Sequence, residues 1–319
     1  MCGLFGFSTY REKVTHDLTK LTNALAKQSS IRGTDATGIA FCQGGHIQIH
    51  KEALSASKLT FSHPPVIRSL IGHTRHSTQG SEKNNYNNHP FSGKAGGVRF
   101  ALAHNGVLTN DDSLKALYQL PKTRIETDSY VAVQMIEKQR EFSFASLRAM
   151  AEAVDGSFTF SLLDDRDNIY LVKGNSPLSI LHFPTEKIYV FASTEEILYR
   201  GLIDSPLFDA LREKKYEEIP IHSGTIMKIS PDGDVETDSF TYKAYYGKSW
   251  YDYGYRPYHM TLSDDKNAAR QTYIDELKYM AMFQGYEPSY VDELLAADVT
   301  LEEIEEWLYS EGELYERYY

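Results

Sequence analysis

Cysteine is scarce in this chain of 319 residues, which contains only Cys2 and Cys42. Two cysteines cannot form a disulfide framework, and such scarcity is typical of a cytoplasmic protein. The cysteines and histidines also lack the paired spacing of a structural zinc site, so we expect no metal. Cys42 ends the apolar run Ile39–Cys42 and is therefore predicted to lie in the core.

Long hydrophobic runs are absent as well. No apolar stretch approaches the roughly 20 residues that a membrane helix needs, and no signal peptide precedes Cys2. Neither of the glycine-rich phosphate-binding patterns, GxGxxG and GxxxxGK[ST], occurs in the sequence. We therefore expect a cytoplasmic protein without a membrane contact and without a cofactor.

A net positive charge is absent from the chain as a whole. The formal net charge is −11, and residues 263–319 account for all of it with 15 acidic and 4 basic residues. This distribution argues against nucleic-acid binding and indicates a separate acidic module at the C-terminus. Such a module can dock a basic partner or merely solubilise the protein, and the sequence leaves both interpretations open.

Hydrophobic periodicity predicts a mixed α/β body over the first 240 or so residues. Helices are predicted at 14–25, 127–138 (with Thr127 as its cap) and 144–154. Strands are predicted at 38–42, 46–50, 66–72, 100–104, 158–163, 169–172, 178–182 and 188–192. The first two strands flank Gly44-Gly45 and should form a hairpin. This order of elements favours α+β layering over a parallel βαβ sheet.

The C-terminal part divides into two predicted segments, 241–262 and 263–319, after a domain at 2–240. Seven of the seventeen residues in 242–258 are tyrosines, which indicates a strap packed on the body or a surface on which a ligand stacks. Helices are then predicted near 264–283, 289–296 and 301–309, the last with a Thr300–Glu303 capping box. Five apolar residues could form a small core or a docking face: Leu294, Leu295, Ile304, Trp307 and Leu308.

The position of Cys2 carries the strongest chemical information. If Met1 is removed, as expected before so small a residue, Cys2 carries a nucleophilic thiol and a free α-amine. The pKa of an α-amine is roughly 7.7–8.0, which suits a general base at neutral pH. One residue could then supply nucleophile and base together. The alternative is that position 2 merely holds a small residue.

Other residues match what an N-terminal thiol needs to cleave the amide of a free amino acid. Asn105 and Gly106, expected in a sharp turn at a strand end, could donate to an oxyanion. Arg75 offers a fork for an α-carboxylate, and Asp128 offers a carboxylate for an α-ammonium. Taken singly, each feature has an ordinary explanation. Asn105-Gly106 could be a hairpin turn, Arg75 a surface charge, and Asp128 a residue that helps to cap a helix.

Several motifs together resemble the class II glutamine amidotransferase family, as in glucosamine-6-phosphate synthase and amidophosphoribosyltransferase. The similarity covers roughly residues 2–240. It rests on Met1-Cys2-Gly3-Leu4-Phe5-Gly6, Arg32-Gly33-Thr34-Asp35-Ala36-Thr37-Gly38, Gly72-His73-Thr74-Arg75, His104-Asn105-Gly106 and Glu126-Thr127-Asp128, and it continues in order through Asp155-Gly156-Ser157-Phe158, Gly174-Asn175-Ser176-Pro177-Leu178 and Phe191-Ala192-Ser193-Thr194.

The resemblance implies an αββα four-layer sandwich, the fold of N-terminal-nucleophile hydrolases, and hydrolysis of glutamine to glutamate and ammonia through a thioester. It implies that Cys2 is the nucleophile and that Asn105 and Gly106 form the oxyanion hole. Arg75 with Thr78 would hold the α-carboxylate, and Asp128 the α-ammonium. His104 and His89 match positions near the site without a firm role.

The chain departs from this family in two respects. His76 and Gln79 stand where the aminosugar enzymes carry Trp and His, on a loop that closes over glutamine; we place His76 among the substrate-binding residues. The following segment, 82–88, is polar and asparagine-rich, which predicts a flexible lid or a surface loop. In addition, the roughly 80 residues after the body are too few for the synthase domain that uses the ammonia.

Three functions therefore stay open. The first is a glutaminase subunit that delivers ammonia to a separate synthase docked on the acidic tail. The second is a stand-alone γ-glutamyl amide hydrolase whose tyrosine strap lines the substrate site. The third is a silent interaction protein, against which the intact Cys2, Arg75, Asn105 and Asp128 argue.

Overall fold

The computed structural model describes residues 2–11, 18–242, 271, 274–275, 277–278, 281 and 286–309. The chain divides into two compact units, Met1–Tyr245 and Tyr246–Tyr319. We describe each unit by itself.

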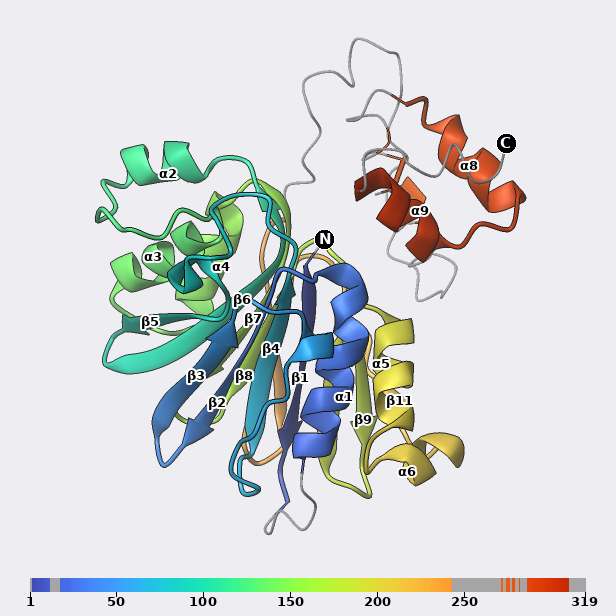
Figure 1. Cartoon of the computed structure of the whole chain (residues 1–319). Helices are drawn as coiled ribbons and strands as arrows, with labels where there is room; N and C mark the ends of the chain where they lie inside the picture. Colours follow the sequence, from blue (N-terminus) through green and yellow to red (C-terminus); the bar gives the residue numbers. More distant parts are fainter. Residues whose placement is uncertain are drawn as a thin grey trace. The chain divides into compact units, whose positions relative to one another are not determined.

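The first unit contains two antiparallel sheets over its described residues (Figure 1). One sheet has the strand order β11 (Glu217–Glu218), β9 (Ser179–Phe183), β10 (Ile188–Ala192), β1 (Gly3–Thr9), β4 (Ser69–Arg75), β2 (Ala36–Gln43), β3 (His46–Glu52). The other has the order β13 (Val235–Ser239), β12 (Thr225–Ile229), β8 (Ile169–Lys173), β7 (Gly156–Asp164), β6 (Val98–Leu108), β5 (Phe91–Ala95).

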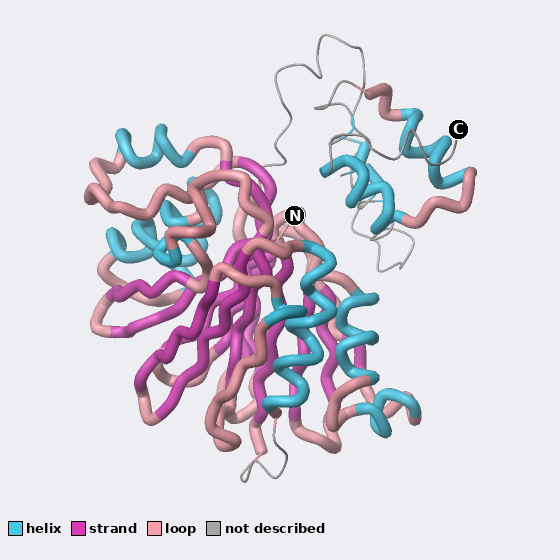
Figure 2. The backbone as a smooth tube through the Cα atoms, in the orientation of Figure 1, coloured by secondary structure: helices cyan, strands magenta, loops and turns pink. Residues whose placement is uncertain are grey.

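Helices cover the outer face of each sheet, and Figure 2 shows the strands as inner layers between them. The first sheet carries α1 (Thr19–Ser29), α5 (Glu195–Ile203) and α6 (Phe208–Arg212). The second carries α3 (Tyr130–Gln139) and α4 (Phe144–Ala153), with α2 (Asp111–Leu117) beside them. Short 3-10 turns occur at η1 (Ser30–Arg32), η2 (Ala56–Lys58) and η3 (Asn85–Asn87).

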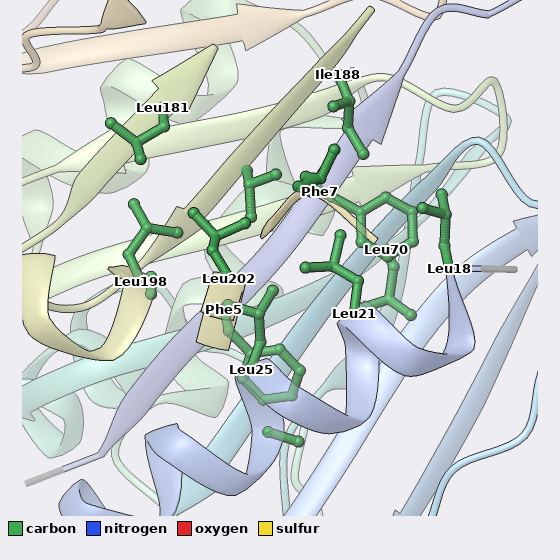
Figure 3. Packing of buried hydrophobic residues seen from close by; sticks show 14 of the residues in the cluster. Phe5, Phe7, Leu18, Leu21, Leu25, Leu70, Leu181, Ile188, Leu198 and Leu202 are labelled. Carbon is green, nitrogen blue, oxygen red and sulfur yellow. The ribbon is translucent and has the colours of Figure 1, made fainter. Parts of the chain in front are cut away.

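Strand β1 explains why the layers stack in this order. All seven of its residues are buried. Since side chains alternate across a strand, Phe5 and Phe7 enter the core under α1 and α5, where Figure 3 shows them beside Leu21 and Leu202. Leu4 enters the core between the two sheets instead. A strand buried on both faces needs a layer on each side, and the αββα arrangement predicted from the sequence is confirmed.

Most of the predicted elements of this unit are present. The hairpin of β2 and β3 turns at Gly44 and Gly45, whose φ angles of 58° and 74° suit glycine. Cys42 is buried, as expected. The first predicted helix, 14–25, overlaps α1, but residues 12–17 lie outside the described residues and the helix continues to Ser29. At the end of α1, the Thr74 hydroxyl donates to the Ser29 carbonyl at 2.7 Å. The hydrophobic pattern did not indicate the last turn of the helix, because this contact is polar.

Two local predictions are wrong. Thr127 does not cap α3, because the helix begins at Tyr130 and Ser129 occupies the cap position. Asn105 and Gly106 do not form a sharp turn, since β6 continues through them to Leu108 and remains paired with β7. Gly106 instead takes a φ of 138° inside the strand.

The second unit contains α8 (Ser289–Ala296) and α9 (Leu301–Tyr309), as predicted. The predicted capping box is present: the Thr300 N–H donates to Glu303 Oε2 at 2.9 Å, and the Glu303 N–H donates to Thr300 Oγ1 at 3.2 Å. Ile304, Trp307 and Leu308 are buried together, with Leu294 and Leu295 packed against them.

Two predictions on this part of the chain lie largely outside the described residues. They are the tyrosine-rich strap beyond residue 242 and most of the helix at 264–283, whose described residues are helical. Among the residues that the structure describes, no helix has the length and apolar character needed to cross a bilayer.

Candidate active site

Cys2 lies at the head of the central strand β1. Gly3 pairs with Thr74, so Cys2 lies beside the end of β4, where Arg75 and His76 follow. Its thiol donates to the His76 carbonyl at a sulfur–oxygen distance of 3.6 Å, and its own carbonyl accepts from Arg32 Nε at 2.9 Å. Burial raises the pKa of the Cys2 thiol, although the charge of Arg75 lowers it. A thiol of raised pKa is protonated at neutral pH and needs a base to become a nucleophile.

Arg75 ends β4 and is 2% exposed. Its guanidinium donates to Asn88 Oδ1 from Nη1 and to the carbonyls of Gln79 and Gly80 from Nη2, each at 2.7 Å. Burial lowers the pKa of Arg75, but an arginine stays charged in proteins. A guanidinium has five N–H donors, so these three bonds leave two for a carboxylate.

Asp128 connects the end of β6 to the segment before α3. One carboxylate oxygen accepts from the Leu108 N–H at 2.7 Å, and the other accepts from the Ser129 hydroxyl at 3.2 Å. Asp128 is 4% exposed. Its charge acts on both Cys2 and Arg75, raising the pKa of each, so the three groups lie within electrostatic reach of one another.

Asn105 reaches the same region from the second sheet. Its fully buried side chain donates to Ser193 Oγ at 3.5 Å, and that hydroxyl also accepts from the Leu4 N–H at 2.7 Å. Gly106 follows it, and a Cβ there would lie 2.0 Å from the Ser157 carbonyl oxygen. Only glycine fits this backbone.

Three buried histidines, His73, His89 and His104, lie near this point. The rings of His73 and His89 lie 4.1 Å apart; His73 Nε2 contacts the His104 carbonyl at 2.9 Å, and His104 Nδ1 contacts the Ser129 hydroxyl at 2.8 Å. Burial lowers the pKa of each ring, to about 3 for His73. All three are therefore neutral at pH 7. Within the described part of the chain, no three His, Cys, Asp or Glu side chains are grouped to hold a metal.

His76 and Thr78 lie on the loop that leaves β4. His76 is half-buried, and burial lowers the pKa of its ring. Asp35 anchors the loop by accepting from the Ser77 N–H at 2.7 Å. Thr78 is exposed. The structure therefore gathers Cys2, Arg75, Asp128 and Asn105 at one end of the two sheets, with His76 against the thiol and Thr78 at the rim.

The asparagine-rich segment 82–88, predicted as a flexible lid or a surface loop, is partly or fully exposed over residues 82–86 but buried at its end. Asn87 and Asn88 are fully buried. Asn87 donates to Glu126 Oε2 at 2.8 Å and accepts from the Glu126 N–H at 2.9 Å. Hydrogen bonding buries these polar residues, which a hydrophobic pattern cannot indicate.

Sequence reasoning assigned no role to three residues that contact this site: Arg32, Asn88 and Ser193. Two of them stand in motifs that carried the family resemblance, so a signal was available for Arg32 and Ser193. Asn88 stands in the motif Asn87-Asn88-His89-Pro90, but nothing in the sequence distinguished it from Asn87.

Comparison with known proteins agrees with this geometry. Residues 73–200 match the family described as "Glutamine amidotransferase domain". The glutamine–fructose-6-phosphate aminotransferase (isomerizing) of Halalkalibacterium halodurans is 32% identical over 188 residues, and that of Staphylococcus aureus strain Mu50 is 34% identical over 194. Each match covers 56% of this chain and 30% of the relative, so the chain spans about a third of the length of these relatives.

A solved structure supports the fold. Glutamine phosphoribosylpyrophosphate amidotransferase from B. subtilis aligns with a TM-score of 0.59 at 21% identity, over 75% of this chain and 49% of that chain. The αββα layers, with a cysteine at the head of the central strand, are the arrangement that the sequence resemblance implied. Residues 73–200 therefore match the glutamine amidotransferase domain family, and the chain is similar to glutamine-dependent enzymes over part of its length.

Proposed function

We propose that this protein hydrolyses the side-chain amide of glutamine to glutamate and ammonia, through a thioester on Cys2. The observation that carries the proposal is the position of the Cys2 thiol, beside the Arg75 end of β4 and within electrostatic reach of Asp128. A thiol near a fixed cation and a fixed carboxylate suits a substrate amino acid, which carries both an α-carboxylate and an α-ammonium.

Each residue then has a definite role. The free N–H groups of Arg75 bind the α-carboxylate, with the exposed Thr78 at the rim, and Asp128 binds the α-ammonium. His76 holds the thiol through its carbonyl and borders the substrate. His104 orients the segment of Ser129 and Asp128, while His89 fills the space between the sheets.

The chemistry needs no cofactor. The α-amine of Cys2, free once Met1 is removed, takes the thiol proton while sulfur attacks the amide carbon. Asn105 Nδ2 and the Gly106 N–H donate to the oxyanion. The C–N bond then breaks, and the amine returns the proton to the leaving ammonia. A water molecule, activated by the same amine, hydrolyses the thioester to glutamate.

We further propose that the ammonia passes to a separate synthase that binds the acidic tail. The two relatives named above transfer nitrogen from glutamine to a sugar phosphate, and residues 263–319 carry the whole net charge of this chain. Removing residues 263–319 should leave glutamate release unchanged and lower transfer of nitrogen to the partner's product. High salt screens charges, so the difference in nitrogen transfer between the full chain and the truncated chain should become smaller in high salt.

The direct test is the release of glutamate and ammonia by protein that begins at Cys2. Equal amounts of both from glutamine would support the proposal. Release from γ-glutamyl amides other than glutamine, with none from glutamine, would instead favour the stand-alone hydrolase. No release from any of these amides would support the silent interaction protein.

Asn105→Ala should lower kcat by about 10²–10³-fold and change KM little, because the oxyanion forms only in the transition state. Steady-state kinetics with glutamine measures both constants. The matched control is Asn110→Ala, which removes bonds to the Ala153 carbonyl and Asp155 at the exit of β6. Asn110→Ala should keep kcat, and an equal loss in both variants would contradict the oxyanion role.

A further inference from the structure

Asn88 fixes one edge of the Arg75 guanidinium. Its side chain is fully buried, and its Oδ1 accepts from Arg75 Nη1 at 2.7 Å. Its Nδ2 donates to the Glu82 carbonyl at 2.8 Å and to Asn85 Oδ1 at 3.1 Å. Because both amide hydrogens are bonded on the loop side, the oxygen is held toward Arg75.

Lys51 in turn fixes the segment that carries Asn88. It lies on the edge strand β3, and its ammonium donates to the carbonyls of Asn88 at 2.5 Å and Pro90 at 3.1 Å. The same Nζ lies 5.2 Å from the centroid of the Phe91 ring. The Lys51 carbonyl accepts from Asn85 Nδ2 at 2.7 Å. The lysine therefore anchors the segment on both sides of His89.

The charged and titratable groups around Lys51 are cations or neutral rings. Arg75 on β4 faces it, and the rings of His73 on β4 and His89 on the following segment lie near it. No described carboxylate forms an ion pair with Lys51. Burial, and after it the charge of Arg75, lowers the pKa of Lys51 to about 8. The ammonium is therefore charged below pH 8 and loses its proton as the pH rises through this value.

We propose that Asn88 and Lys51 are positioning residues that hold the Arg75 guanidinium in the orientation that binds the α-carboxylate of the substrate. The proposal rests on the function proposed above, since it concerns the same site. Neither residue takes part in the chemistry of Cys2. Their loss should therefore weaken substrate binding and leave the chemical step intact.

Asn88→Leu keeps the size of the side chain and removes its hydrogen bonds. We expect KM for glutamine to rise about tenfold, as for a lost bond to a charged group, while kcat changes less than about threefold. Asn87→Leu is the matched control, because Asn87 is an equally buried neighbour bonded to Glu126. An equal rise of KM in both variants would overturn the proposal, since the loop fold alone would then explain it. Thermal unfolding confirms that both variants are folded.

The pH dependence tests Lys51. In the unaltered protein, KM should rise between pH 7 and 9 as the ammonium loses its proton. In Lys51→Arg, whose charge persists at all these pH values, the rise should be smaller. The substrate ammonium and the Cys2 α-amine also titrate between pH 7 and 9. The quantity to compare is therefore the rise of KM in the unaltered protein minus the rise of KM in Lys51→Arg. Lys51→Met should have a raised KM already at pH 7. Identical pH profiles for the unaltered protein and Lys51→Arg would overturn the role of Lys51.

Alkylation of Cys2 separates this proposal from the proposed function. The probes are a diazoketone analogue of glutamine, which carries the α-carboxylate, and iodoacetamide, which lacks it. Asn88→Leu should slow the first reagent about tenfold and leave the second unchanged. If the unaltered protein reacts with both reagents, two results for Asn88→Leu would overturn the positioning role. One is that both reagents are slowed equally, and the other is that neither reagent is slowed. An unaltered protein that the glutamine analogue does not label would overturn the proposed function itself.

Discussion

Replacement of Cys2 by alanine is expected to abolish glutamate release from glutamine, with a loss of at least about 10³-fold. The sulfur is the atom that attacks the amide carbon in the proposed mechanism, and alanine leaves the rest of the site in place. The measurement is glutamate release under saturating glutamine, together with a search for a thioester by mass spectrometry after rapid acid quenching.

The chain provides a matched control in its second cysteine. Cys42 is 4% exposed on β2, and its thiol donates to the Asp165 carbonyl at 3.5 Å. Burial raises the pKa of Cys42 to about 11, so it is a poor nucleophile. Cys42→Ala should keep its activity. Release that persists in Cys2→Ala would rule out the thioester mechanism.

Retention of Met1, or an N-terminal tag, is the second change with a large expected effect. The α-nitrogen of Cys2 then becomes a peptide nitrogen, which cannot take a proton from the thiol. General-base catalysis contributes about 10²–10⁴-fold, and kcat should fall by that factor. Burial already raises the pKa of the Cys2 thiol, so little thiolate forms without a base.

A cleavable tag makes this experiment reversible. Cleavage that leaves Cys2 as the first residue should restore the full rate, and a C-terminal tag should have no effect. Edman degradation or mass spectrometry identifies the first residue in each sample. Equal rates for the tagged and cleaved proteins would place the base on another residue.

The sequence by itself determined those elements of the fold that have a local signal. Apolar alternation and glycine pairs are local signals, and they identified the β2–β3 hairpin and the four strands from β7 to β10. The capping box of α9 is equally local, since Thr300 and Glu303 contact each other within one turn. The motifs around Cys2, Arg75 and Asp128 indicated the family resemblance, because each is a short run of adjacent residues.

The tertiary structure decided the features that depend on distant partners. Asn105-Gly106 has the composition of a turn, but pairing with β7 keeps it extended. The segment with Asn88 is polar enough for a surface loop, but Asn88 at its end is buried and bonded to Arg75 and Lys51. Ser193 bonds to Leu4 of β1, 189 residues away in sequence, and to Asn105, 88 residues away. Hydrogen bonds between residues so far apart in the chain leave no periodic pattern, so only the folded structure reveals them.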